Sequence, residues 1–514
     1  MRNYLRLAVA TVLALGGLAS SVALAQAPKE LVVYEVADFL RLDPAFGATT
    51  QERSVQHIMF NSLVRWDENL EIIPDLATSW SVSDDGLVWT FEMRGDATFW
   101  DGSSVRPGDV KFSIDRVLDE ATSASRRSAY TYIQEVTVVG PTSVSIRTEA
   151  PNPDLLSDLA DGSVDVLSEA FVTRVGADFA LTPENTMGSG PYRIVEWVRG
   201  ERAVLEPHDG YHLGRPNLDR IVYRFVPESF ARVAGLLTGE AHIANRIPPE
   251  EVDGLRANPD VALLEVPSAQ LVSYELNTAK GPLADVRVRR ALNLAIDRQA
   301  IIDAVMSGLA DPATSPTGPV AGRAEFDPFP YDPDEAMRLL AEAGYADGFD
   351  LTLHTSNGRY LKDQEAAEAI QAYLGAVGIR TTVEVQEWAV LTELWGRDPN
   401  VDSKQAWIVG RSAPNLIFNL RRLYHTDATL SPTAQIWTGY QNPELDRLLD
   451  EASATLDPNE RAALLNEAQA VLWDDVPFFY LWSVRLVIGT RPEVTGVIVT
   501  PRERLLLNFA GLAN

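Results

Sequence analysis

The sequence contains no cysteine in 514 residues. This absence excludes disulfide bonds, thiolate metal ligands, cysteine nucleophiles and a lipid anchor attached to a cysteine. Histidine is also scarce, with six residues, and His208 and His212 alone have the HxxxH spacing of a zinc helix. Asp209-Gly210 interrupts a helix between them, and no glutamate stands where a zinc protease requires one. We therefore expect a polar turn here, and neither a bound metal nor a cofactor.

Long apolar runs are absent after the first 25 residues. Before that point, Arg2 and Arg6 precede an uncharged run from Leu7 to Ala25 that ends in a small-x-small exit. This order predicts a cleavable signal peptide over residues 1–25 and export to the periplasm. A membrane anchor is the alternative, but the run is rich in Ala, Gly and Ser, which disfavours it.

Motifs for catalysis are missing as well. There is no G-x-S-x-G elbow and no P-loop, and Gly188-x-Gly190 is too short for a dinucleotide fingerprint. With 72 acidic and 44 basic residues, the formal net charge is −28. A chain this acidic does not bind nucleic acid or an anionic membrane through its general field. The chain thus has few recognisable catalytic motifs for its length.

The pattern of apolar residues predicts a mixed α/β fold, most clearly over 333–385. Phe349, Leu351 and Leu353 alternate as a half-buried strand, and Asp363 is placed to cap the helix that follows. Gly378 ends that helix before a second alternating strand, so a parallel strand pair is expected. Other expected strands cover 87–93, 133–148 and 192–206, and other expected helices cover 109–119, 228–239 and the segment after Asp457.

A set of ordered motifs resembles family 5 of the solute-binding proteins, the peptide- and nickel-type receptors of ABC importers. The motifs that carry the resemblance are Leu42-Asp43-Pro44, Asn61-Ser62-Leu63, Pro74 to Trp80, Asp84 to Arg94, Phe99 to Gly102, Asp109 to Ser113, Met187 to Tyr192, Val286 to Leu292, Ala295 to Arg298, and Asn442 to Asp446. They cover nearly all of the chain after the signal peptide, in the family's order.

The resemblance implies a two-lobed periplasmic-binding-protein fold with a hinged cleft that holds the ligand. Lobe I would contain residues 26–55, 185–277 and 483–514, with an extra subdomain at 56–184, and lobe II would contain 278–482. The hinge is expected near 276–278 and 481–483. Closure around the ligand would deliver it to an inner-membrane ABC permease, with the receptor acting as a monomer.

The loop TSNGRYLKD, residues 355–363, follows a strand and precedes a helix, where open α/β sheets bind ligands. Gly358-Arg359-Tyr360 and Asp363 resemble a G-R-Y-x-x-D motif of one branch of the family. Arg359 has two interpretations: a guanidinium that binds an anionic group of the ligand, or one that forms a structural ion pair. Tyr360 would lie beside it, and Asp363 is interpreted as a helix cap.

One region departs from the family pattern. Peptide receptors of the family often carry an acid for the peptide ammonium, but residues 407–415 contain no Asp or Glu and add Arg411. Peptide-like ligands remain the largest expected class. Because a buried ammonium would have no acid here, anionic, N-blocked or neutral ligands are favoured over peptides with a free ammonium. Trp407, Asn415 and Trp388 are predicted to line the site, with a place in the core as the alternative, and Asn277 at the hinge completes the set.

Three classes of function remain open at this stage. The leading hypothesis is a periplasmic receptor for a small peptide-like solute, and its variant takes an opine, an oligosaccharide, a chelated metal or another anionic compound. A sensory or chaperone role on the same fold is the second class. A periplasmic enzyme is the third, and no nucleophile–base pair in the sequence supports it.

Overall fold

The computed structural model describes residues 28–46, 49–67, 71–388, 390–391, 406–411, 415–430, 438–500 and 502–513. The predicted signal peptide, residues 1–25, lies outside them. In the described part of the chain, no helix combines the length and the hydropathy needed to cross a bilayer.

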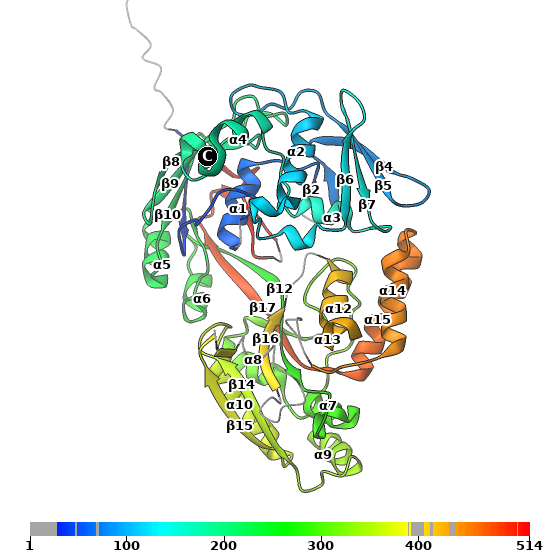
Figure 1. The fold of residues 1–514 in the computed structure, drawn as a ribbon. Helices are drawn as coiled ribbons and strands as arrows, with labels where there is room; N and C mark the ends of the chain where they lie inside the picture. Colours follow the sequence, from blue (N-terminus) through cyan, green and yellow to red (C-terminus); the bar gives the residue numbers. More distant parts are fainter. Residues whose placement is uncertain are drawn as a thin grey trace, which may run out of the picture.

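A mixed β-sheet connects the two ends of the molecule. Its strands are β1 (Glu30–Glu35), β8 (Tyr192–Val198), β9 (Arg202–Pro207), β10 (Arg220–Phe225), β11 (Ile243–Ala244), β12 (Ala262–Leu276), β13 (Ala310–Pro312), β14 (Asp350–Ser356), β15 (Arg380–Gln386), β16 (Ala406–Arg411) and β17 (Phe478–Thr490). They follow the order β15-β14-β16-β12-β17-β11-β1-β10-β9-β8, and β13 pairs with β17. Figure 1 shows two groups of elements, with β12 and β17 running from one to the other.

The antiparallel pair of β12 and β17 crosses between the groups. Ala262 lies opposite Thr490 at one end, and Glu275 lies opposite Phe478 at the other. The register is interrupted between Pro267 and Leu271, which leaves the backbone of both strands less regular at this place. On β17 the interruption lies close to the hinge segment expected at 481–483. On β12 it lies upstream of the hinge segment expected at 276–278.

Lobe I is built on β1, β8, β9, β10 and β11, with the helices α1 (Thr50–Met59), α5 (Ser229–Thr238) and α6 (Pro249–Arg256). Short pairs near the C-terminus are β18 (Val494–Thr495) with β21 (Gly511–Leu512) and β19 (Ile498–Val499) with β20 (Leu505–Leu506). Its core also contains Ile58, Met59, Phe171 and Phe179. Segments of the predicted extra subdomain therefore pack against lobe I.

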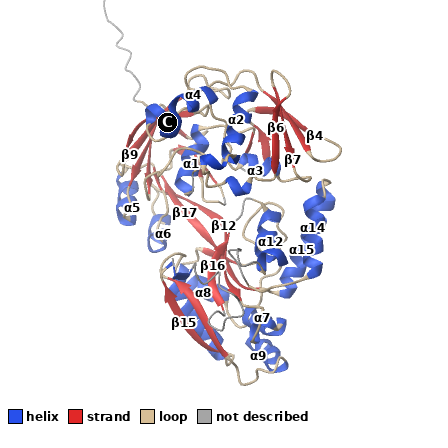
Figure 2. Cartoon of the chain, in the orientation of Figure 1, coloured by secondary structure: helices blue, strands red, loops and turns tan. Residues whose placement is uncertain are grey.

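The extra subdomain has a sheet and a core of its own. Its elements are β2 (Val64–Trp66), β3 (Ile72–Pro74), β4 (Ala77–Val82), β5 (Val88–Met93), α2 (Pro107–Leu118), β6 (Ile133–Val138), β7 (Ser143–Thr148), α3 (Leu155–Ala160) and α4 (Glu169–Val175). Four strands pair in the order β4-β5-β7-β6, and α2 and α3 lie beside them (Figure 2). Phe91, Ile114 and Ile146 are fully buried in this core, so the subdomain packs as a unit.

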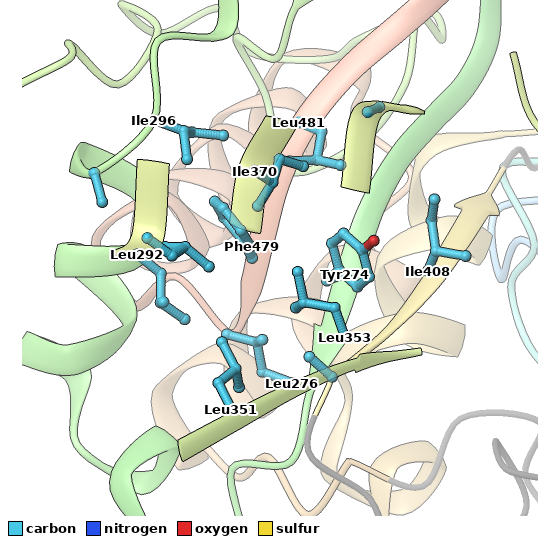
Figure 3. Packing of buried hydrophobic residues seen from close by; sticks show 14 of the residues in the cluster. Tyr274, Leu276, Leu292, Ile296, Leu351, Leu353, Ile370, Ile408, Phe479 and Leu481 are labelled. Carbon is cyan, nitrogen blue, oxygen red and sulfur yellow. The ribbon is translucent and has the colours of Figure 1, made fainter. Parts of the chain in front are cut away.

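Lobe II combines β13 to β16 with two groups of helices. The helices are α7 (Val286–Leu294), α8 (Arg298–Met306), α9 (Pro333–Glu342), α10 (Asp363–Ala376), α12 (Leu416–Tyr424), α13 (Thr426–Thr429), α14 (Pro443–Ala454) and α15 (Pro458–Asp475). In the main core, Tyr274 and Leu276 of β12 pack beside Phe479 and Leu481 of β17 (Figure 3). A second core lies between α12, α14 and α15. The crossing strands are thus anchored in lobe II by large apolar side chains.

Several local predictions are confirmed. Asp332 caps α9 by accepting a hydrogen bond from the Glu335 backbone amide, and Asp457 caps α15 in the same way. Gly239 ends α5 in the left-handed region, with φ of 78°. Strands β14 and β15 pair in parallel around α10, as the alternating residues predicted.

A buried ionic network ties the C-terminal segment to the extra subdomain. Asp161 forms ion pairs with Arg502 and, at 2.8 Å, with Arg504. Although burial opposes ionisation, these two arginines hold the pKa of Asp161 below its usual range. Burial and Arg504 lower the pKa of His57 to about 3, so its neutral Nε2 accepts a hydrogen bond from Arg504. The network fixes where Arg502 stands.

The turn at 187–192 packs directly on the end of α1. The Gly190 amide donates to the Met59 carbonyl oxygen at 2.9 Å. A Cβ on Gly190 would stand 2.5 Å from the Met59 carbonyl carbon. We expect Gly190→Ala to lower the free energy of unfolding by about 1–3 kcal/mol, because the backbone of α1 cannot move away freely.

This change is measured by chemical denaturation, with a two-state fit to the transition in which lobe I unfolds. The matched control is Gly108→Ala in α2, where an added Cβ meets nothing within 4 Å. An equal loss of stability in both variants would show that the contact with α1 is not the cause.

Candidate functional site

The loop between β14 and α10 is held by one carboxylate. Asp363 accepts a hydrogen bond from the Ser356 hydroxyl at 2.5 Å and from the backbone amides of Gly358, Arg359 and Tyr360 at 3.0, 3.0 and 3.2 Å. The prediction that Asp363 is the N-cap of the helix is wrong, because Lys362 occupies the cap position and Asp363 is the first helical residue. Its side chain turns back and fixes the loop instead.

Two aromatic rings support the guanidinium of Arg359. Tyr360 and Trp388 meet edge to face, with centroids 5.9 Å apart. The Arg359 guanidinium carbon lies 5.6 Å from the Tyr360 ring centroid and 5.1 Å from that of Trp388. Tyr360 is buried, whereas Arg359 is exposed and forms no ion pair with a carboxylate of the described residues. Among the described residues, no carboxylate is therefore available for the structural ion pair that was the alternative interpretation of Arg359.

Trp407 and Arg411 of β16 face a buried acid. Trp407 Nε1 donates to Glu275 Oε2 at 2.7 Å, and Arg411 donates to Glu275 Oε1 at 3.1 Å through Nε and at 3.0 Å through Nη2. Glu275 and Trp407 are fully buried and directly paired across β12 and β16. Residues 407–415 contain no acid of their own, and the neighbouring strand β12 supplies the one that pairs with Arg411.

Sequence reasoning missed Glu275 because its partners are 132 and 136 positions away along the chain. The available signal was an acidic residue between two large apolar ones, Tyr274-Glu275-Leu276. A buried carboxylate of this kind requires a charged or hydrogen-bonding partner, and the pairing of β12 with β16 identifies it.

A first cavity, of about 800 Å³, opens between lobe I and the loop of β14 and α10. Its lining includes Gln270 of β12 and Leu486 of β17. The charged residues that line it are Arg246, Arg359, Lys362, Arg485, Arg502 and Glu503. Glu503 is already paired with Arg246 at 2.8 Å. Lys362 is paired with Glu365, Arg485 with Asp311 and Arg502 with Asp161. Among the described residues, Arg359 is thus the cation of this basic cavity that has no acidic partner, which favours an anionic occupant.

A second cavity, of about 780 Å³, lies between the extra subdomain and α12 of lobe II. Arg502 lines both cavities, so the two are neighbours along one cleft. At the far rim, Arg461 of α15 forms an ion pair with Asp154, and Figure 1 shows α14 and α15 close to the extra subdomain. The lobes therefore touch at the rim and enclose space on either side of Arg502.

The seven predicted binding residues divide between these places. Arg359 and Tyr360 line the first cavity and Asn415 lines the second. Asn415 also caps α12, since its Oδ1 accepts from the Phe418 amide at 2.9 Å. Trp388 supports Arg359 from the side, and Asn277 is buried with its Oδ1 accepting from the Ala279 amide at 3.2 Å. Trp407 and Arg411 stand at Glu275, beneath the loop.

The two histidines with HxxxH spacing contact different polar groups. His208 contacts the Thr98 hydroxyl at 3.4 Å, and His212 lies 3.4 Å from a carboxylate oxygen of Asp75. Within the described ranges, no group of three His, Cys, Asp or Glu side chains is arranged to hold a metal ion.

Comparison with known proteins gives matches over most of the chain. Residues 71–468 match the model of bacterial extracellular solute-binding proteins, family 5 Middle. The chain is 31% identical over 499 residues to a glutathione-binding protein GsiB of Salmonella choleraesuis (strain SC-B67), which covers 94% of this chain and 95% of that protein.

Two solved structures show the same architecture. The unliganded open form of the murein tripeptide-binding protein MppA matches with a TM-score of 0.82 at 25% identity, covering 95% of this chain and 98% of that one. DppA from Helicobacter pylori in complex with the peptide STSA matches with a TM-score of 0.75 at 25% identity, covering 95% and 99%. The chain described here belongs to family 5 of the bacterial extracellular solute-binding proteins.

Proposed function

We propose that the ligand is a small anionic, peptide-like solute bound between the lobes, with a glutathione-like tripeptide as the leading candidate. Membership of the family makes the protein a solute receptor that delivers its ligand to an ABC importer. The relatives that are 31% identical over almost the whole chain and are named for glutathione support the peptide-like class. The basic cavity supports the anionic character of the ligand.

Arg359 carries this proposal. Its guanidinium is exposed in a cavity of about 800 Å³, a volume within the usual range of small-ligand sites. Tyr360 and Trp388 restrict its position, and a guanidinium in a fixed orientation binds a carboxylate with two parallel hydrogen bonds. Of the seven predicted residues, Arg359, Tyr360 and Asn415 are the ones proposed to contact the ligand, and the other four to support them.

The boundaries of the lobes and the hinge belong to the same proposal. We place the hinge at the register interruption of β12 between Pro267 and Leu271, together with the facing part of β17. The higher TM-score with an unliganded open form than with a peptide complex of equal identity supports an open arrangement of the lobes. Ligand binding would then bend this segment and bring lobe II toward lobe I.

The remaining features follow from the family and the sequence. The signal peptide, residues 1–25, would be removed on export, and the absence of cysteine leaves no site for a lipid anchor at the cleavage point. The receptor would act in the periplasm as a monomer, without catalysis and without binding nucleic acid. Its transport role needs shape and hydrogen bonds but no nucleophile.

Replacing Arg359 by alanine tests the anion contact. We expect Arg359→Ala to weaken the binding of glutathione by more than tenfold, because a carboxylate loses its charged hydrogen bonds. Isothermal titration calorimetry on protein that was unfolded and refolded to remove carried ligand measures the change.

The control for Arg359 is Arg380→Ala, an exposed arginine of β15 that pairs with Asp350. Unchanged affinity in Arg359→Ala, with lowered stability, would make Arg359 structural. A thermal-shift panel of peptides, N-blocked peptides, opines, oligosaccharides and nickel–histidine identifies the ligand class, and a shift confined to neutral ligands would contradict the proposal.

Asp363 is expected to act on the ligand through the loop. Asp363→Ala removes the acceptor of three consecutive backbone amides, 358 to 360. We expect hydrogen exchange of these amides to become at least about tenfold faster and glutathione affinity to fall severalfold, because the loop is no longer ordered before binding. Exchange measured by mass spectrometry should stay normal in Glu368→Ala, an exposed acid of the same helix. Unchanged exchange in Asp363→Ala would show that other contacts hold the loop.

A further inference from the structure

The second cleft cavity contains a carboxyl group that forms no ion pair with any lysine or arginine of the described residues. Asp158, in α3, accepts a hydrogen bond from the Tyr132 hydroxyl at 2.6 Å through Oδ2. Its Oδ1 accepts from Asn415 Nδ2 at 3.4 Å. Tyr132 belongs to the extra subdomain and Asn415 to lobe II, so both sides of the cleft contact this one carboxyl group.

Two neighbouring acids of the same cavity, Asp154 and Asp161, are already neutralised. Asp154 is paired with Arg461, and Asp161 is paired with Arg502 and Arg504. Arg126, which the subdomain contributes to the lining of the cavity, pairs with Asp161 at 3.5 Å. Asp158 therefore differs from them in having neutral partners alone among the described residues.

The groups around Asp158 come from both walls of the cavity. The charged and titratable side chains of the cavity wall near it are Arg126, Tyr130, Tyr132, Glu149, Asp154 and Asp161 on the subdomain and Arg421, Arg422 and Arg502 on the other elements. Burial, opposed by the hydrogen bond from Tyr132 and assisted by Asp154 and Asp161, raises the pKa of Asp158 to about 7. The carboxyl group thus lacks a positive charge close enough to keep it ionised throughout the neutral range.

The family's usual place for an ammonium-binding acid is not available here. The acid beside β16 is Glu275 of β12, and its two oxygens accept hydrogen bonds from Trp407 and Arg411. Asp158 stands on the opposite wall, in the cavity that shares Arg502 with the basic one. An ion pair with the ligand would remove the cost of a buried carboxylate without a counter-ion.

We propose that Asp158 forms a second subsite of the cleft, which binds a primary ammonium group of the ligand. The inference rests on the proposed function, because the ammonium belongs to the same peptide-like solute whose anionic group Arg359 binds. The ligand would extend past Arg502, with its negative end in the basic cavity and its positive end beside Asp158, Tyr132 and Asn415. The ligand class is thereby narrowed to zwitterionic peptides with a free amine.

The subsite has a pH dependence of known sign. Below a pKa of about 7, Asp158 is largely protonated, and binding of an ammonium must release that proton. The affinity for a free-amine ligand should therefore rise with pH, by about tenfold or more between pH 5.5 and 7.5. The affinity for the N-acetylated form of the same ligand, which has no ammonium group, should not rise with pH in this way.

Titration calorimetry with matched ligands tests the subsite. The probes are glutathione and trialanine, each with a free and with an N-acetylated amine. At pH 7.5 we expect the wild type to prefer the free-amine form at least tenfold, and Asp158→Asn to lose that preference. Glu135→Gln, an exposed acid of the same subdomain with the same change of charge, should keep it.

Each outcome decides between the two proposals. Equal binding of free and acetylated forms by the wild type, or an undiminished preference in Asp158→Asn, would overturn the ammonium subsite and leave the receptor function intact. Failure of folded wild type to bind any of the four probes would overturn the peptide-like ligand and the subsite with it. If Asp158→Asn does not fold, a wild-type preference that does not grow from pH 5.5 to 7.5 overturns the inference.

Discussion

The pairing of β12 with β17 is the constraint on which the cleft depends. Their antiparallel register runs from Ala262 and Thr490 in lobe I to Glu275 and Phe478 in lobe II. Each end is fixed by large buried side chains, while the middle, between Pro267 and Leu271, loses its regular pairing. Ser268 and Gln270 of the same segment line the basic cavity, so the proposed hinge borders the proposed ligand site.

Charge inside the cleft is distributed differently from charge on the molecule as a whole. The chain carries a net charge of −28, yet the lining of the first cavity contains one acid and five cationic residues, four of which are paired with acids. Asp161 holds Arg502 at the boundary of the two cavities through a buried ion pair. Because an ion pair in a protected place is screened less by solvent, such fixed charges select ligands more sharply than surface charges do.

The ionic groups in and around the cleft fall into two kinds. Glu275 with Arg411, and Asp161 with Arg502 and Arg504, are complete pairs that hold elements together. Arg359 and Asp158 lie on opposite sides of the cleft and have no oppositely charged partner among the described residues. This difference in pairing, more than residue type, separates structural charges from candidates for ligand contact.

The sequence by itself determined the family, the class of fold and many local features. The caps at Asp332 and Asp457, the end of α5 at Gly239 and the parallel pair around α10 follow from residues that are neighbours in the chain. Tertiary structure alone decided the partners of Glu275 and Asp158. Glu275 meets Trp407 across 132 positions, between neighbouring strands, and Asp158 meets Asn415 across 257 positions, between the extra subdomain and lobe II. No local sequence pattern encodes contacts between residues so far apart in the chain.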